Sequence, residues 1–152
     1  MVVVRQATRK DTPALARLFV EYQKEQGKTK IKKSTAIALV AHLFSTHKRF
    51  YVAEDDEVIG MIRFIAKYSV EKLGVKTSHD KRECGFISDG FVTKSKRRMG
   101  VLSLLLQRAE SAAKEANVKY VYLTTFKSYM VSFCKKQGYT EVNSTVFLKQ
   151  LK

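Results

Sequence analysis

The feature that most constrains the fold lies at residues 84–106, CGFISDGFVTKSKRRMGVLSLLL. An apolar run typical of a strand leads into a strongly basic loop, and an apolar helix with a glycine in its first turn follows. Helix N-termini carry N–H groups without intrahelical partners and the positive end of the helix dipole, so they bind phosphate. Lys94, Lys96, Arg97 and Arg98 add positive charge there. The segment predicts a strand–loop–helix unit that holds a polyphosphate, although a basic surface loop without a ligand has the same pattern.

Apolar spacing predicts four helices. In the first, Leu15, Leu18, Phe19 and Tyr22 recur at i, i+3, i+4 and i+7, which is one helical face. Thr12 is expected to be its N-cap with Pro13 at the first helical position, and Gly27 is expected to end it. The second helix is expected to begin after a cap at Ser34 and to bury Ile37, Val40, Ala41 and Phe44. The third covers residues 99–115 and buries Leu104, Leu105, Ala109, Ala112 and Ala113, and the fourth covers residues 129–137.

Seven strands are predicted between and around these helices. They cover residues 2–6, 50–53, 58–66, 83–92, 118–125, 139–142 and 144–151. Residues 54–57 form an acidic hairpin turn, and Gly90 inside its strand indicates a bulge. The order βααβββαβαββ predicts an α/β fold with one mixed sheet and helices on both faces.

Length and composition favour one domain, residues 1–152, because 152 residues with 45% hydrophobic content can bury a single sizeable core. The longest mostly apolar run, residues 36–44, is too short to span a bilayer. The N-terminus lacks an apolar core of signal-peptide length. We therefore expect a cytoplasmic protein with no membrane partner.

The charge is strongly positive, with 29 Lys and Arg against 14 Asp and Glu, for a net charge of +15. Such a basic protein attracts nucleic acid, anionic lipid or acidic ligands. The basic residues are spread along the chain, so a lysine-rich solvated surface explains the same composition.

Cysteine and histidine give no sign of a metal site or a disulfide framework. Cys84 and Cys134 lack the CxxC spacing of zinc ligands, and His42, His47 and His79 are dispersed. We expect the histidines to be surface or satisfied core residues.

Four segments in order resemble the GNAT superfamily of acyl-CoA-dependent N-acetyltransferases. The opening VVVRQATRKDTPALARL is similar to the family's first strand and helix, with Arg5, Ala7 and Asp11 at its habitual spacing. FYVAEDDEVIGMIRF is similar to its second and third strands, and YMVSFCKKQGY to its fourth helix. SDGFVTKSKRRMGVLSLLL resembles its cofactor-binding segment, whose loop pattern is Arg/Gln-x-x-Gly-x-Gly/Ala. The resemblance covers nearly the whole chain.

This resemblance implies a mostly antiparallel mixed sheet of six or seven strands with about four helices. It also implies direct transfer of an acetyl group from acetyl-CoA to a primary amine, without a metal or a covalent enzyme intermediate. The backbone amides of Arg98 to Leu102 would hold the pyrophosphate, and Arg97 would add charge. The cofactor-binding residues it implies are Phe91, Val92, Thr93, Arg97, Arg98, Met99, Gly100, Val101, Leu102 and Ser103.

Two positions depart from the family pattern. Arg97 and Gly100 match the loop, but Leu102 stands where the family has a small residue. Its backbone N–H can still bind phosphate, while its side chain narrows the space. Cys134 stands where the family often has the tyrosine that protonates the leaving thiolate.

Asp89 and Phe91 are the candidates for the chemistry on the bulged strand. A backbone N–H near Phe91 would polarise the thioester carbonyl, and one such donor typically contributes about 3 kcal/mol. Asp89 is the candidate base or water-positioning group, although an ordinary aspartate, with a pKa near about 3.9, is a weak base at neutral pH. The alternative is that Asp89 ends the strand by accepting hydrogen bonds from nearby amides.

Cys134 is the candidate acid for the departing thiolate, because its ordinary pKa of about 8.5 is no worse matched to the task than the value of about 10 for tyrosine. It is shorter than tyrosine, so a bridging water would be needed. The alternative is a small buried hydrophobic residue. Tyr129 could take the acid role in place of Cys134, but it is five residues away along the helix and therefore points in a different direction from Cys134.

The acceptor is not identified by the sequence. Residues 28–34 lie where the family frames the acceptor pocket, and their lysines favour an amine that also carries carboxylate or phosphate. Two other functions stay open: an acyl-CoA-binding module that has lost turnover, and a basic protein that contacts nucleic acid non-specifically. A homodimer is common in the family, and no residue here requires it.

Overall fold

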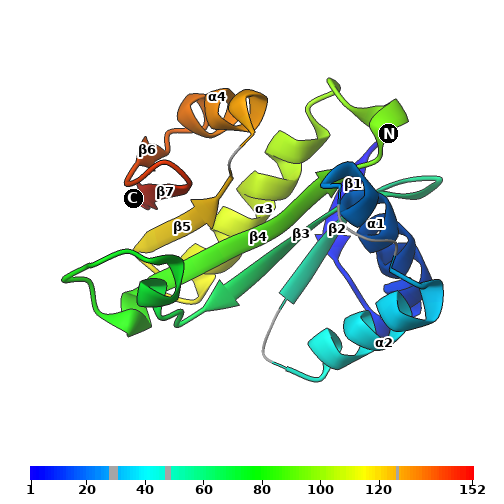
Figure 1. The fold of residues 1–152 in the computed structure, drawn as a ribbon, viewed down its shortest axis with the longest axis horizontal. Helices are drawn as coiled ribbons and strands as arrows, with labels where there is room; N and C mark the ends of the chain where they lie inside the picture. The colour runs from blue at the N-terminus through cyan, green and yellow to red at the C-terminus, as the bar shows by residue number, and fades with distance from the viewer. Residues whose placement is uncertain (28–30, 47–48, 126) are drawn as a thin grey trace. The chain divides into compact units, whose positions relative to one another are not determined.

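The computed structural model describes residues 1–27, 31–46, 49–125 and 127–152. Within these ranges the elements follow the predicted order βααβββαβαββ (Figure 1), which confirms the expected mixed α/β fold. The strands are β1 (Val3–Gln6), β2 (Arg49–Asp55), β3 (Glu57–Ala66), β4 (Cys84–Val92), β5 (Tyr120–Thr124), β6 (Thr140–Glu141) and β7 (Val146–Gln150). The α-helices are α1 (Thr12–Glu25), α2 (Lys33–Phe44), α3 (Val101–Glu115) and α4 (Ser128–Lys136). Short 3-10 helices cover Arg9–Asp11, Val70–Leu73, Lys81–Glu83 and Lys94–Lys96.

The strands form a seven-stranded sheet in the order β1-β2-β3-β4-β5-β7-β6. β1 is antiparallel to β2, and both β5 and β6 are antiparallel to β7. β4 and β5 are parallel, with residues 84–87 opposite residues 120–123, which is possible because α3 provides the crossover. The predicted mixed sheet is therefore confirmed, with seven strands.

Two compact units make up the chain: residues 1–63 with 89–108, and residues 64–88 with 109–152. The single domain expected from the length stays a prediction. In the first unit α1 packs against α2 (Figure 1). The core of this unit is built from buried side chains of its helices and strands: Ala7, Leu15, Ala16, Leu18, Phe19, Ala36, Val40, Leu43, Phe50, Val52, Val58, Met61 and Phe91.

The buried face of α2 differs from the prediction. Val40 is buried as expected, but its buried neighbours are Ala36 and Leu43, while Ile37 and Ala41 are exposed. The helix is apolar around most of its circumference, so its periodicity does not identify which face packs inward. Leu104 of α3 is likewise 42% exposed, and Leu106 is buried in its place.

The helix starts are also shifted from the prediction. Thr12 is the first residue of α1 and Asp11 is its N-cap, because the 3-10 helix Arg9–Asp11 leads directly into α1. Ser34 lies inside α2, which begins at Lys33. In the β2–β3 hairpin the strands extend into the predicted acidic turn, and Asp56 alone connects them with a φ of 63°.

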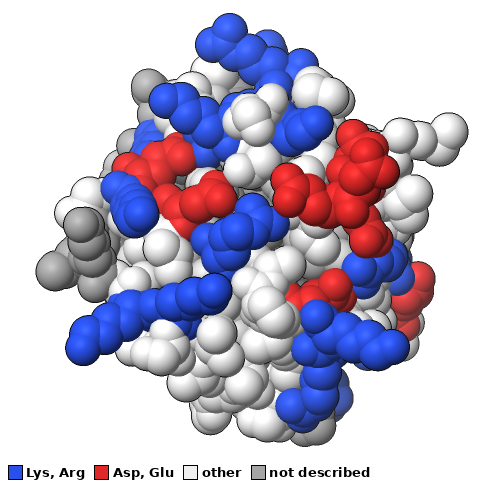
Figure 2. Space-filling view, turned by 90° about the vertical axis from the view of Figure 1, so that its right-hand side faces the viewer, with Lys and Arg blue, Asp and Glu red and all other residues white. Residues whose placement is uncertain are grey.

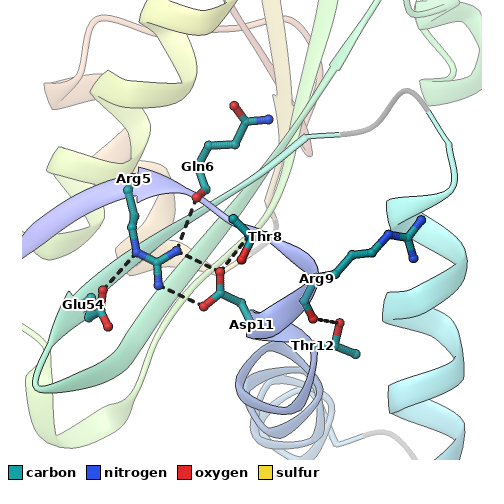
Figure 3. A network of polar contacts seen from close by, with 7 residues as sticks. All are labelled: Arg5, Gln6, Thr8, Arg9, Asp11, Thr12 and Glu54. Atoms are coloured by element: carbon teal, nitrogen blue, oxygen red, sulfur yellow. Dashed lines mark hydrogen bonds and ion pairs between the residues drawn. The ribbon is translucent and has the colours of Figure 1, made fainter.

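Asp11 is tied to β1 and β2 through Arg5 (Figure 3). Both terminal nitrogens of Arg5 donate to Asp11, at 2.8 and 2.9 Å, and Nε of Arg5 donates to Glu54 at 2.9 Å. Asp11 also accepts from the backbone N–H of Thr8 at 2.8 Å. Arg5 and Asp11 thus fix the entry to α1.

In the second unit, Val70, Val75, Cys84, Tyr122 and Val146 form a core. The segment between β3 and β4 joins this core through His79, whose Nδ1 lies 3.0 Å from the hydroxyl of Tyr122. The His79 ring also stacks on Tyr120. His79 is therefore a satisfied, half-buried side chain. His42 is exposed, and His47 lies outside the described residues.

Gly85 of β4 gives a stability prediction. A Cβ added there would lie 2.6 Å from Cε2 of Phe64, a buried ring, and 3.1 Å from Cγ1 of Val118. Gly85→Ala is expected to lower the free energy of unfolding by about 1–3 kcal/mol, because the ring must shift. Urea denaturation measures this. The matched control is Gly90→Ala on the same strand, where the nearest atom is at 3.4 Å; equal losses for both variants would contradict the prediction.

Candidate active site

Asp89 lies in β4 with a left-handed backbone, at a φ of 55°. Its Oδ2 lies 2.8 Å from Nε of Arg63 on β3, and the two side chains are 20% and 16% exposed. A left-handed residue interrupts the regular geometry of a strand, and aspartate adopts this conformation more readily than most residues. The distortion predicted near Gly90 is thus centred one residue earlier, on Asp89.

Phe91 and Val92 end β4, and each is 6% exposed. The ring of Tyr22, from α1, meets the ring of Phe91 edge-on, with centroids 5.5 Å apart. The guanidinium of Arg97 also lies over the Phe91 ring, 5.2 Å from its centroid. These contacts hold the end of the strand, and with it the backbone of Phe91, in one position.

The loop that follows turns back toward α3. The N–H of Thr93 donates to Ile59 O at 2.8 Å, and the N–H of Lys96 donates to Thr93 O at 2.9 Å. Arg98 and Gly100 both have left-handed backbones, with φ of 64° and 78°. A Cβ added to Gly100 would meet no atom within 4 Å, so the loop backbone there faces open space.

α3 begins directly after this loop. Leu104 N donates to Gly100 O at 3.1 Å, so Gly100 accepts the first hydrogen bond of the helix. The first turn of a helix presents its N–H groups and dipole to an anion. Val101 is buried, and Cδ1 of Leu102 would lie 3.4 Å from a Cβ on Gly90. The Leu102 side chain is therefore directed toward β4.

Arg97, which the family resemblance places near the pyrophosphate, contacts α1 in this structure. Its Nη1 donates to Glu25 at 3.0 Å, its Nη2 pairs with the other carboxylate oxygen of Glu25, and its Nε donates to Val92 O at 2.8 Å. Arg98 and Met99 are exposed, Met99 at 58%. Asp89, Phe91 and the loop through Ser103 all belong to the first unit, and the structure brings them together there.

Cys134 belongs to the second unit, on the inner side of α4, and is 1% exposed. Burial raises the pKa of its thiol to about 11. The thiol therefore keeps its proton at neutral pH and is enclosed by protein. Tyr129, in the same helix, is 57% exposed, with the Lys127 ammonium 6.0 Å from its ring centroid.

Four residues near the site were not identified as site residues from the sequence: Glu21, Tyr22 and Glu25 of α1, and Arg63 of β3. Tyr22 was expected only on the apolar face of the first helix. Glu21 Oε2 accepts from the hydroxyl of Thr93 at 2.9 Å. The signal in the sequence is slight: two glutamates at i and i+4 on one helix in a chain with twice as many basic as acidic residues.

Among the described residues, no cluster of three or more His, Cys, Asp or Glu side chains could hold a metal ion. None of the described helices is long and apolar enough to cross a membrane. The site instead combines a carboxylate, a strand end and a helix N-terminus behind a basic loop. Such an arrangement can hold an anion and present a carboxylate to a second reactant.

Comparisons with known proteins agree with this geometry. The model of the acetyltransferase (GNAT) family matches residues 12–139. An acetyltransferase from Thermus thermophilus is 18% identical with a TM-score of 0.78, and covers 99% of this chain and 97% of its own. An N-acetyltransferase from Staphylococcus aureus is 16% identical with a TM-score of 0.76. The match covers 100% of this chain and 99% of the Staphylococcus aureus chain. A GNAT family acetyltransferase from Brucella melitensis in complex with acetyl-CoA is 13% identical with a TM-score of 0.73. The match covers 100% of this chain and 89% of the Brucella melitensis chain.

A search of curated proteins found no match to this sequence. The family model nevertheless spans most of the chain, and the solved structures share its fold over nearly their full lengths. The chain belongs to the GNAT acetyltransferase family, which confirms the resemblance read from the four sequence segments.

Proposed function

We propose that this acetyltransferase transfers an acetyl group from acetyl-CoA directly to a primary amine. The observation that carries the proposal is the loop before α3, where Arg98 and Gly100 are left-handed and an added Cβ on Gly100 would meet no atom within 4 Å. This leaves room for a diphosphate against the amides of the first helical turn. Similar structures from Brucella melitensis, Salmonella typhimurium and Clostridium acetobutylicum contain acetyl-CoA.

Acetyl-CoA supplies an activated acetyl thioester. The backbone amides of Arg98 to Leu102 would bind its diphosphate, with Met99, Val101 and Ser103 lining the same turn. The backbone of Phe91 and Val92 would bind the amide-bearing arm as an added strand does. Thr93 would follow them at the edge of the site, since its N–H already donates to Ile59 O. A backbone N–H near Phe91 would polarise the thioester carbonyl.

Asp89 would take the proton of the acceptor amine or position the water that takes it. The left-handed backbone and the Arg63 contact hold the carboxylate in one orientation. A fixed carboxylate can orient an amine for attack before any proton moves.

We propose that Cys134 serves the core, because it is 1% exposed and an acid role would need a bridging water at its thiol. Cys134→Ala is expected to lower the free energy of unfolding by about 1 kcal/mol and to leave turnover unchanged. Urea denaturation and steady-state rates measure the two effects. A large fall in kcat for a folded Cys134→Ala protein would assign the acid role to Cys134 instead.

The acceptor we propose is an amine that also carries carboxylate or phosphate. Lys32 and Lys33, at the start of α2, are exposed, and they are part of the segment expected to frame the acceptor. Residues 28–30 of that segment lie outside the described residues. A positively charged rim disfavours polyamines and attracts acidic groups.

The proposal is tested by a thiol-release assay. Acetyl-CoA is mixed with the protein and with matched amines that differ in charge: amino acids, their amides, aminoalkyl phosphates and polyamines. Amine-dependent release of free thiol, with a mass gain of one acetyl group on the amine, supports it. Thiol release with polyamines alone would contradict the acceptor class, and no release above the protein-free rate would favour an acyl-CoA-binding module.

Nucleic-acid contact, a homodimer and a cytoplasmic location stay predictions. The net charge of +15 favours non-specific binding to nucleic acid. On the face in Figure 2, however, basic side chains are interspersed with acidic ones. Cys84 and Cys134 are free and buried, as is usual in reducing compartments.

A further inference from the structure

One face of α1 contacts the cofactor segment at three points. Glu21 accepts from the Thr93 hydroxyl at 2.9 Å, Tyr22 packs edge-on against Phe91, and Glu25 pairs with Arg97. These three residues occupy the last two turns of the helix. The contacts join α1 to the strand end and to the loop, although these segments are far apart in sequence, with Arg97 and Glu25 separated by 72 residues.

The Arg97 side chain is the centre of these contacts. Both terminal nitrogens face Glu25, Nε donates to Val92 O, and the guanidinium plane lies over Phe91. A guanidinium held in this two-pronged way has its orientation fixed by the carboxylate. Its fork is thereby directed at α1, while the left-handed residues Arg98 and Gly100 follow it in the chain.

We propose that Glu25 is a positioning residue of the acetyl-CoA site, which acts through Arg97. Glu25 holds Arg97 across the end of β4, and Arg97 in turn holds the loop of residues 97–100 ahead of α3. The proposal rests on the proposed function, because it assumes that this loop binds the diphosphate of acetyl-CoA. Arg97 then contributes by shaping the loop, and the phosphate is bound by backbone amides.

The orientation of the Arg97 side chain depends on the Glu25 carboxylate. Without Glu25, the Arg97 side chain loses its fixed orientation, and the loop must be ordered when the ligand binds. The ordering cost weakens binding but leaves the chemical step unchanged. If Arg97 bound the diphosphate itself, Glu25 would compete with the ligand, and removal of the carboxylate would strengthen binding.

The experiment is a double-mutant cycle with Glu25→Gln, Arg97→Ala and the double variant, and with Lys24→Gln as the control on the same turn of α1. Isothermal titration measures the Kd for acetyl-CoA, and steady-state rates separate KM from kcat. Each single variant is expected to raise Kd and the KM for acetyl-CoA about tenfold with kcat unchanged. The double variant is expected to bind no more weakly than Arg97→Ala, and Lys24→Gln is expected to bind like wild type.

Two results would overturn the proposal: tighter or unchanged binding by Glu25→Gln, or additive losses in the double variant. Amide hydrogen exchange of residues 93–103 in the ligand-free proteins gives a separate readout. Faster exchange in both single variants supports the positioning role, and wild-type exchange in Glu25→Gln contradicts it. If wild type binds no acetyl-CoA, the proposed function fails, and the exchange measurement still decides whether Glu25 positions the loop.

Discussion

Asp89→Asn is expected to lower kcat by about 10²–10⁴-fold while the Kd for acetyl-CoA stays unchanged. The carboxylate is the group proposed to accept or relay the proton of the acceptor amine, and an amide cannot do so. Asparagine tolerates the left-handed φ of 55° and is the same size, so β4 is expected to keep its shape. Thiol release at saturating acetyl-CoA measures kcat, and isothermal titration measures Kd.

The matched control for this prediction is Asp56→Asn. Asp56 is also an aspartate with a left-handed backbone, at a φ of 63°, but it lies in the exposed β2–β3 turn. It is expected to keep the wild-type kcat. A wild-type kcat in Asp89→Asn would remove Asp89 from the chemistry and leave it the role of ending the regular part of the strand.

Asp11→Ala is expected to have the largest effect on stability, a loss of about 2–3 kcal/mol in the free energy of unfolding. Asp11 is 7% exposed, and its removal leaves Arg5 and the N–H of Thr8 without this acceptor. The loss is smaller than for a fully buried ion pair, because 34% of the Arg5 side chain is exposed. Urea denaturation at neutral pH measures it, with Asp55→Ala, at the surface pair with the amino terminus, as the control. Equal losses in the two variants would contradict the prediction.

The same pair gives a pH dependence. The hydrogen bonds from Arg5 lower the pKa of Asp11 below its ordinary value of 3.8, despite its burial. A carboxyl whose pKa is lowered on folding stabilises the protein above its unfolded pKa, and this contribution disappears as the pH falls through the folded value. The stability difference between wild type and Asp11→Ala should therefore be constant above about pH 5 and shrink below pH 3.8. A difference that stays constant into the acid range would contradict the assignment.

Element order could be predicted from this sequence because strand and helix periods differ clearly along most of it. The buried face of α2 could not be predicted, because the pattern of a helix that is apolar on nearly every side does not indicate which side packs inward. Ala36 is buried where Ile37 was expected. The cap of α1 was placed one residue late for another reason. A 3-10 turn ahead of a helix contains the same residue types as a helix N-cap, so only the backbone conformation distinguishes the two.

The site was partly predictable for a similar reason. The basic loop and the glycine before α3 are local features, so the sequence places them together. The partner of Arg97 is Glu25, 72 residues away, and only the packing of α1 on the end of β4 brings the two side chains together. The strand distortion was expected near Gly90, the residue with the freest backbone, and the residue that adopts the left-handed conformation is its neighbour Asp89.

The most direct test of the central claim is isothermal titration of the purified protein with acetyl-CoA at physiological salt, after removal of any copurified ligand. The loop between Arg97 and α3 is proposed to hold the diphosphate, so one-to-one binding with a micromolar Kd is expected. No detectable binding would mean that the family fold is present here without its acetyl-CoA site, and the proposed transfer reaction would be wrong.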